Sequence, residues 1–479
     1  MSSDSLRSRW SDLPVKHRCR VVASASARLC DVSQDLIDAC TSEQRVDPVE
    51  TITSEMLPLS AALRFIGRRG PRILKPRRLG MRDRPAWLWG VRTRIERQPH
   101  GNVLVLGTWN YPLLLPGVQV AQGLAAGNRV QLKPAPGTES ASEILVDCFH
   151  RGGVPTSQLQ LLSSSTQAAI EAVDQGPDLI VLTGAAETGG KVLGAAAKHL
   201  SACIMELSGC DAVIALPGFD LERLTDALRF GLLFNGGATC IGPRRLIIQN
   251  DDAAVVIERL KEKLSGEPPV IVHPSARDAV ANEIVAAIQT GASDVIGRFD
   301  ESELRESGRL APVVLRGVDA KDSIAQADLF APVVSVIELE GVDDAIQIVN
   351  ECPYRLAASV FGPSAAARRM AVRLNVGSIS INDLIVPTAD PRVPFGGRGR
   401  SGFGVTRGAE GLLAMTTPRV FSTRAGRFAA HLQPRQLGDE EILHGLLHFS
   451  SSRGLQKRLA GLRRIVDGVK KSRRMPPDA

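Results

Sequence analysis

Short apolar runs alternate with helical patterns along residues 101–207, and this alternation is the strongest constraint on the fold. The runs recur about every 25 residues, at 103–106, 129–132, 159–162 and 179–182. Helical patterns separate them at 112–126, 140–150 and 167–173. This spacing is typical of βαβ units and predicts a parallel, doubly wound sheet. A ligand of such a sheet binds beyond the carboxyl ends of its strands, where Gly107, Lys133 and Gly184 lie.

The α/β pattern continues in a second region, from about residue 211 to 400. Its predicted strands lie at 212–216, 246–248, 270–272, 333–337 and 378–382, and a helix is predicted at 221–234. The first 60 residues are predicted to be helical, with no turn between 15 and 40. A length of 479 residues suits two or three domains.

The sparse cysteines indicate a reducing compartment, and hydropathy indicates neither a signal peptide nor a spanning helix. We therefore expect the protein to be located in the cytoplasm. The eight cysteines are sparse, form no C-x2-C pair and have no histidine at zinc-ligand spacing, so no metal site is expected. The first ten residues are polar and lack the apolar core of a signal peptide. No run of 18 apolar residues is present, so no spanning helix is predicted.

The net charge of +7 is distributed unevenly. Residues 61–100 hold 12 basic and 2 acidic residues, and residues 451–479 hold 9 basic and 2 acidic residues. The remaining chain therefore has 37 basic against 47 acidic residues. Basic patches of this kind are either surface arginines that contact only solvent or binding surfaces for anionic lipid or nucleic acid. Because no aromatic residues interleave with the basic residues of the tail, no nucleic-acid partner is expected.

The tail from about residue 422 differs from the preceding chain in composition. Five apolar residues follow a 4-3-4-3 spacing on an otherwise basic helix: Leu455, Leu459, Leu462, Val466 and Val469. Such a seam can dock on the protein's own body, on a partner helix or, as a peripheral contact, on a membrane surface. Glycines at 454, 461 and 468 argue against a rigid coiled coil.

A glycine-rich turn follows the run at 179–182 and resembles a phosphate-binding loop. Five residues separate Gly184 from Gly190-Lys191, where a Walker A loop has four, and Val192 replaces its hydroxyl residue. We therefore reject an ATPase. A strand that leads into such a turn and then a helix still allows its backbone to approach a pyrophosphate.

Three polar side chains at strand ends or turns are candidates for catalysis. Cys240 follows a glycine-rich stretch and precedes Arg244 and Arg245, whose positive charge would favour a thiolate. Glu206 ends a predicted strand at 203–205, and Asn110 follows the first strand of the sheet. Each can be structural, as a buried thiol, a cap or a core amide. Their shared position on an α/β scaffold favours a functional role.

At these residues the chain resembles the aldehyde dehydrogenase superfamily, and seven motifs occur in the family's order over some 300 residues. They are W-N-Y-P at 109–112, G-N-x-V-x-L-K-P at 127–134, T-G at 183–184, E-L-x-G at 206–209, N-x-G-x-x-C at 235–240, Y-x-L-A-A-x-V-F at 354–361 and P-F-G-G with S-G-x-G at 394–404. The short N-terminal region resembles the class 3 branch, whose members are often dimers that act on medium or long aliphatic and aromatic aldehydes.

The resemblance implies the domain organisation. A dinucleotide-binding domain comprises 1–85 and 102–207, a catalytic α/β domain comprises 208–400, a small oligomerisation arm comprises 86–101 and 401–424, and a basic extension comprises 425–479. It also implies oxidation of a small-molecule aldehyde to a carboxylic acid with NAD or NADP, by a homodimer that is joined through the arm.

In the family mechanism Cys240 attacks the aldehyde, Asn110 and the Cys240 N–H hold the oxyanion, and Glu206 activates the water that hydrolyses the thioester. Lys133 would bind the adenosine ribose region, and the turn from Gly184 to Gly189 would face the pyrophosphate. The remaining implied cofactor contacts are Thr108, Trp109, Asp328 and Phe330.

The cofactor motifs depart from the family pattern. Asp328 replaces the glutamate that holds the nicotinamide ribose, Pro136 replaces an acidic residue that often favours NAD over NADP, and Ala185 replaces a serine at the pyrophosphate. These changes predict an altered cofactor preference. Two alternatives stay open: CoA-acylating oxidation, against which Glu206 argues, and a non-catalytic scaffold whose cofactor site has decayed.

Overall fold

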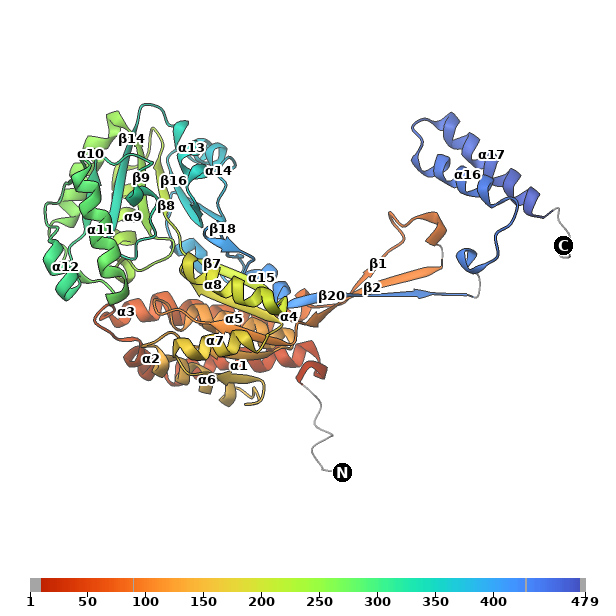
Figure 1. Ribbon diagram of the computed structural model, residues 1–479, viewed down its shortest axis with the longest axis horizontal. Coiled ribbons are helices and arrows are strands. Elements are labelled where there is room, and N and C mark those ends of the chain that lie inside the picture. Colours follow the sequence, from red (N-terminus) through yellow and green to blue (C-terminus); the bar gives the residue numbers. More distant parts are fainter. Residues whose placement is uncertain (1–9, 89, 427–428, 474–479) are drawn as a thin grey trace, which may run out of the picture. The chain divides into compact units, whose positions relative to one another are not determined.

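The computed structural model describes residues 10–88, 90–426 and 429–473 (Figure 1). The chain divides into two compact units, of which the first comprises Met1–Arg77 and Arg94–Phe421 and the second Arg78–Thr93 and Ser422–Ala479. Parts of the predicted segments 1–85 and 425–479, including the polar N-terminus, lie outside the described residues. The α/β fold class is confirmed.

A six-stranded sheet in the first unit has the strand order β19-β7-β6-β3-β4-β5. Its strands are β3 (Asn102–Leu106), β4 (Arg129–Lys133), β5 (Leu159–Leu161), β6 (Leu179–Gly184), β7 (Ala202–Leu207) and β19 (Gly402–Phe403). The connecting helices are α5 (Leu114–Ala126), α6 (Glu139–Arg151), α7 (Thr166–Asp174) and α8 (Ala186–Ala196). All are parallel except β19, and every element predicted between 101 and 207 is confirmed. The strand order reverses between β3 and β6, which is where a doubly wound sheet binds its ligand.

A seven-stranded sheet in the same unit has the order β11-β13-β14-β9-β8-β16-β17. Its strands are β8 (Asp211–Ala215), β9 (Pro243–Gln249), β11 (Ser293–Asp294), β13 (Val313–Arg316), β14 (Val333–Leu339), β16 (Ala357–Phe361) and β17 (Ser378–Ile381). The helices of this region are α9 (Leu221–Leu233), α10 (Asn250–Leu264), α11 (Arg277–Gln289), α12 (Glu301–Ser307), α13 (Asp344–Glu351) and α14 (Ser364–Ala371). Buried apolar residues from both faces of this sheet form two further clusters of the core.

The sequence prediction for this second sheet was incomplete. The apolar run at 270–272 forms β10 (Val270–Ile271), which pairs with β12 (Arg309–Leu310) in a separate two-stranded sheet. Pro274 comes next in the chain after His273. It has no N–H group to donate, so the strand pairing cannot continue through this position. Strands β11, β13 and β16 were not among the predicted strands.

The N-terminal helical region is broken where no turn was predicted. Helix α1 (Val15–Asp31) ends at Val32, whose φ of −113° is not helical, and α2 (Ser33–Cys40) follows. Arg28 in the last turn of α1 and Asp35 in the first turn of α2 each complement the dipole of their own helix. The region continues with α3 (Pro48–Thr51) and α4 (Leu57–Ile73), and α4 packs on α1 and α5.

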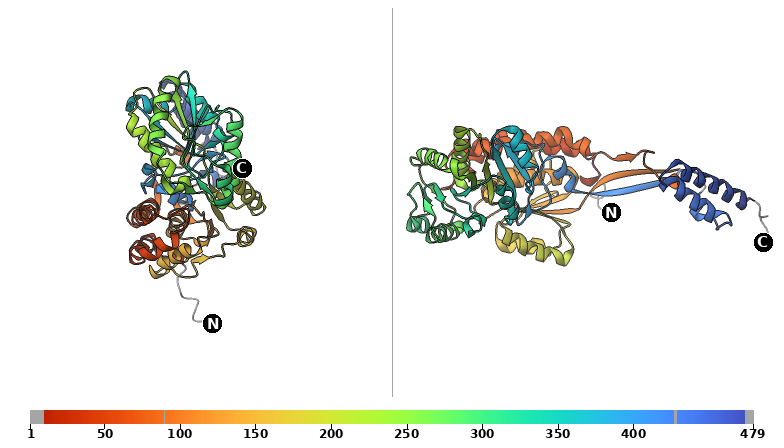
Figure 2. Two further views of the ribbon diagram at one scale, coloured as in Figure 1. Left: turned by 90° about the vertical axis from the view of Figure 1, so that its left-hand side faces the viewer. Right: turned by 90° about the horizontal axis from the view of Figure 1, so that it is seen from above.

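Strands β1 (Arg77–Leu79), β2 (Val91–Pro99) and β20 (Thr416–Arg424) form a three-stranded sheet, and β20 follows α15 (Gly408–Ala414). The second unit contains α16 (Asp439–Ser451) and α17 (Leu455–Ser472), which lie side by side as a hairpin (Figures 1 and 2). Within the described ranges no helix is both long enough and apolar enough to cross a membrane.

Candidate active site

The loop after β3 contacts the loop that carries Cys240. The side-chain amide nitrogen of Asn110 donates to the carbonyl of Ala238, two residues before Cys240, at 2.8 Å. Thr108 Oγ1 donates to Asn110 Oδ1 at 2.7 Å, which turns the amide nitrogen towards the cysteine loop. Tyr111 OH and Thr239 Oγ1 form a third link at 2.6 Å. The structure therefore brings Asn110 beside the segment that ends in Cys240.

The cysteine loop has an unusual backbone that its glycines allow. Asn235, Gly236 and Gly237 all have left-handed φ values, of 54°, 59° and 74°. A Cβ at Gly237 would lie 2.6 Å from the nitrogen of Pro332, so the loop passes directly over the backbone after Ala331. A side chain at this position would force the two segments apart. The glycines thus fix the path of the chain into Cys240.

Glu206 lies near the end of β7 and is 4% exposed. Its carboxylate accepts hydrogen bonds from Gln119 Nε2 at 3.0 Å, from Thr183 Oγ1 at 3.3 Å and from Thr406 Oγ1. Burial is the largest influence on the carboxyl group and raises its pKa, whereas the positive charge of Arg407 lowers it. A raised pKa is what a general base needs near neutral pH.

Cys240 is half-buried, and burial raises the pKa of its thiol to about 12. Burial therefore outweighs the cations that the sequence places near Cys240, of which Arg244 does act electrostatically on the thiol. Arg244 donates to carbonyls of the cysteine loop, and Arg245 donates to the Cys210 carbonyl at 2.7 Å. Arg407, which the sequence reasoning missed, also lowers the pKa of Cys240.

Alkylation of Cys240 is expected to accelerate steadily with pH, because only the thiolate reacts and its pKa is raised to about 12. In the absence of cofactor, the rate constant with iodoacetamide should rise about tenfold per pH unit between about pH 8 and 10. Mass spectrometry of the peptide that contains Cys240 measures it, and the exposed Cys30 provides an accessible thiol in the same sample. A rate that levels off below about pH 9 would contradict the raised pKa.

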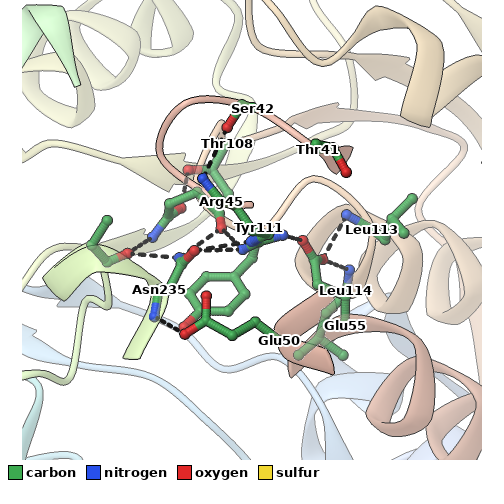
Figure 3. Close-up of polar contacts among 12 residues, drawn as sticks. Thr41, Ser42, Arg45, Glu50, Glu55, Thr108, Tyr111, Leu113, Leu114 and Asn235 are labelled. Carbon is green, nitrogen blue, oxygen red and sulfur yellow. Dashed lines mark hydrogen bonds and ion pairs between the residues drawn. The ribbon is translucent and has the colours of Figure 1, made fainter. Parts of the chain in front are cut away.

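A buried ion pair holds both of these loops (Figure 3). Arg45 and Glu55 are 5% and 0% exposed, and Arg45 Nη1 lies 2.5 Å from Glu55 Oε1. Arg45 also donates to the Asn110 carbonyl at 2.6 Å and to Asn235 Oδ1 at 2.8 Å. The other carboxylate oxygen of Glu55 accepts from the N–H groups of Leu113 and Leu114, at 2.8 and 2.7 Å, where α5 begins. The pair thus orients the segment around Asn110 and satisfies the first amides of α5.

Removal of one partner of this pair is expected to destabilise the protein strongly. Glu55→Gln leaves the Arg45 guanidinium charged in a site without solvent, at a cost of about 3–5 kcal/mol. The urea midpoint of unfolding should fall accordingly, and turnover should fall in samples that remain folded because Asn110 loses its support. The control is Asp31→Asn, which breaks the exposed pair with Arg28 and should cost less than about 1 kcal/mol. Equal midpoints for the two variants would contradict this role.

Two of the predicted cofactor residues have a polar atom that forms no hydrogen bond in the described structure. The ammonium of Lys133, buried at the end of β4, donates no hydrogen bond to the described part of the chain, and burial lowers its pKa. Asp328 Oδ1 is buried without a hydrogen-bond partner in the described structure, and burial raises the pKa of this carboxyl to about 6. A donor and an acceptor left in this condition fit the hydroxyl groups of a dinucleotide's riboses.

The remaining predicted cofactor residues include an aromatic pair near the loop after β3 and two glycines near the end of β6. Trp109 stacks on His273 with ring centroids 4.3 Å apart, and Phe330 lies 5.9 Å from Trp109 in a tilted arrangement. His273 was missed because nothing in its local sequence places it beside Trp109. Gly184 ends β6 at the reversal point of the sheet. A Cβ at Gly189 would lie 2.8 Å from Leu207, so this glycine allows α8 to pack on β7.

Comparison with known proteins matches this geometry to one family. The family model described as "Aldehyde dehydrogenase family" matches residues 2–421. A relative from Methylomonas sp named 4,4'-diapolycopene aldehyde oxidase is 31% identical over 419 residues, which is 85% of this chain and 78% of the relative.

Solved structures share the fold. A Mycobacterium tuberculosis aldehyde dehydrogenase complexed with NAD+ superposes with a TM-score of 0.81 at 24% identity and covers 89% of this chain and 88% of its own. A Streptococcus pyogenes succinic semialdehyde dehydrogenase in complex with NADP+ gives 0.79 at 20% identity, over 87% and 92%. With a family model that extends over most of its length, this chain belongs to the aldehyde dehydrogenase family.

Proposed function

We propose that this NAD(P)-dependent aldehyde dehydrogenase uses Cys240 as its nucleophile, Asn110 as an oxyanion donor and Glu206 as its general base. The observation that carries the proposal is the hydrogen bond from Asn110 to the carbonyl of Ala238. It ties the amide of the first sheet to the cysteine loop of the second sheet. Glu206 also acts electrostatically on Cys240, which supports the proposal that the carboxylate and the thiol belong to one site.

The chemistry then follows from the three groups. The Cys240 thiol loses its proton to solvent, its sulfur forms a bond to the aldehyde carbon, and the carbonyl oxygen becomes an oxyanion that the Asn110 amide stabilises by roughly 3–4 kcal/mol. A nicotinamide cofactor held by Lys133 and Asp328 would supply the hydride acceptor, and loss of hydride from that carbon would leave an acyl thioester on Cys240. Glu206 takes a proton from water, the water oxygen attacks the thioester, and the C–S bond breaks to release the carboxylic acid.

For the cofactor, we propose that Lys133 and Asp328 bind ribose hydroxyls, with Thr108, Trp109, Phe330, Gly184 and Gly189 forming the walls of the site. The relatives with bound cofactor hold NAD+ in one case and NADP+ in another. Pro136 is exposed and uncharged, so no carboxylate at this position repels a 2′-phosphate. We therefore expect this chain to accept NADP.

The cofactor preference is tested by turnover with a panel of aldehydes, followed through the near-ultraviolet absorbance of the reduced nicotinamide. Wild-type protein should use NADP, and Pro136→Glu should lower kcat/KM for NADP about tenfold relative to NAD because it places a negative charge beside the phosphate. An unchanged ratio of the two constants would contradict this role of position 136. Release of an acyl-CoA would instead support CoA-acylating oxidation, and calorimetry that detects neither nucleotide would support the scaffold alternative.

The aldehyde is proposed to be apolar, as in the class 3 branch. A small cavity between α4 and α5 is lined by Phe65, Ile66, Leu114 and Val118, and it reaches Arg407. Arg407 acts electrostatically on both Cys240 and Glu206, which supports this cavity as the candidate binding site for the aldehyde. Faster turnover of long aliphatic or aromatic aldehydes than of short carboxylate-bearing ones would support the assignment.

The quaternary structure, domain boundaries and location are also proposals. We infer a homodimer that is joined through the arm 86–101 and 401–424, since β2 and β20 fall in these segments. The cofactor domain would comprise 1–85 and 102–207, and the catalytic domain 208–400. A cytoplasmic location agrees with eight cysteines that form no disulfide. Sedimentation velocity would test the dimer.

A further inference from the structure

The hairpin of α16 and α17 lies beyond the residues that the family model matches, so its role is separate from the proposed catalysis. Its two helices contact each other through glycines. A Cβ at Gly445 would lie 2.6 Å from the carbonyl oxygen of Gly461, and a Cβ at Gly468 would lie 2.7 Å from that of Gly438. The contacts pair early residues of one helix with late residues of the other, so the helices run antiparallel.

Ile442 and Ile465 pack beside these glycines in the interhelical contact, whereas the leucines of the hairpin are largely left outside it. Leu443 is 63% exposed and Leu455 is 74% exposed. A hairpin held together by hydrophobic burial would place such residues between its helices. Close packing through glycine is instead typical of helices whose apolar side chains face lipid.

The exposed apolar residues gather on one face. Several follow directly after a residue of the interhelical contact: Leu443 after Ile442, Leu462 after Gly461, Val466 after Ile465 and Val469 after Gly468. One residue along an α-helix is a rotation of about 100°. Because the helices are antiparallel, the same rotation turns both rows to the same side of the hairpin. Leu447, Leu455 and Leu459 extend these rows.

The charges on α17 complement an anionic surface. The helix carries six basic residues and one acidic residue, for a net charge of +5. Arg463, Asp467 and Lys470 each follow a residue of the apolar row, so this edge has a net positive charge, and neither Arg463 nor Lys470 forms an ion pair with a described residue. At a membrane surface, an apolar face of this kind can contact the acyl chains of the lipids, and the basic side chains along its edge can bind the anionic headgroups. With the three acidic residues of α16, the two helices together keep a net charge of +2 (5 minus 3).

We propose that this apolar face binds the surface of a membrane that contains anionic lipid, with the hairpin lying in the interface. The helices are not suited to spanning, since none in the described chain meets the length and hydropathy needed to cross. The proposal concerns attachment of the protein and does not depend on which residues catalyse the oxidation.

Vesicle sedimentation of the full-length protein tests the proposal. It should pellet with vesicles of equal parts phosphatidylcholine and phosphatidylglycerol, less with phosphatidylcholine alone, and less at high salt. Leu462→Ser with Val466→Ser should weaken binding about tenfold or more. Arg463→Gln with Lys470→Gln should weaken it roughly tenfold on the anionic vesicles only.

The matched control is Gln456→Ser with Ala460→Ser, two exposed positions of α17 outside the apolar rows, which should bind as wild type does. Circular dichroism confirms that helix content is unchanged in each variant. Failure of the wild-type chain to pellet with anionic vesicles would overturn the proposal. So would equal losses in the apolar variant and the control. If wild type does not pellet and the apolar variant changes the sedimentation coefficient of the free protein, the face is covered by protein and the proposal is wrong.

Discussion

Cys240→Ala is expected to lower kcat by more than about 10⁴-fold, because the alanine methyl cannot form the covalent intermediate on which hydride transfer depends. The folded protein should still bind the dinucleotide, since the predicted ribose contacts, Lys133 and Asp328, belong to other segments. Steady-state formation of the reduced nicotinamide measures the loss, and calorimetry measures the binding. Together the two results would separate a chemical defect from a structural one.

The matched control for this prediction is Cys203→Ala, which removes a second half-buried thiol, in β7. Its turnover should stay close to that of wild type. If Cys240→Ala kept appreciable turnover, or if the two variants lost similar activity, the assignment of the nucleophile would be wrong.

Glu206→Gln is expected to uncouple the two halves of the reaction. The acyl thioester should form as in wild type, but its hydrolysis should slow by about 10²–10⁴-fold because water loses its base. A rapid-mixing experiment should therefore show a burst of about one reduced nicotinamide per subunit, followed by slow turnover. The substitution keeps the size of the side chain, so the contacts from Gln119 and Thr183 are disturbed little.

Two further measurements check the role of Glu206. Hydroxylamine attacks a thioester without a base, so it should restore part of the steady-state rate in Glu206→Gln. The control is Glu410→Gln, at an exposed position in α15, which should behave as wild type does. A variant of Glu206 that lost the burst together with the steady state would indicate a role before hydride transfer and would count against general-base deacylation.

Local periodicity predicted most of the first sheet because each βαβ unit is written into a continuous stretch of chain. Strands β3, β4, β5 and β6 were located within two residues of their observed ends. The same reasoning failed at residue 32, where Val32 is not helical, and it gave no partner for the strand at 270–272, which joins a minor sheet. Pairing partners are remote in sequence, and periodicity carries no information about them.

The candidate catalytic residues could be named from sequence because each follows a recognisable strand or glycine-rich turn. Their electrostatics could not be predicted that way. Arg244 and Arg245 are near Cys240 along the chain, yet their guanidinium groups donate hydrogen bonds to backbone carbonyls. Arg407 is 167 residues away from Cys240 in the sequence, yet its positive charge lowers the pKa of the thiol. Charge interactions depend on distance in space and on burial, and neither can be read from spacing.

The sequence by itself determined the α/β class, the parallel first sheet and the positions of Asn110, Glu206 and Cys240, because these depend on local periodicity and short motifs. Only the tertiary structure decided how they are supported. The buried pair of Arg45 and Glu55 joins segments up to 190 residues apart, and the glycines of the C-terminal hairpin turn its leucines outward. Both arrangements form when segments that are distant in sequence pack together and exclude water. The sequence of either segment alone does not indicate that this packing will occur.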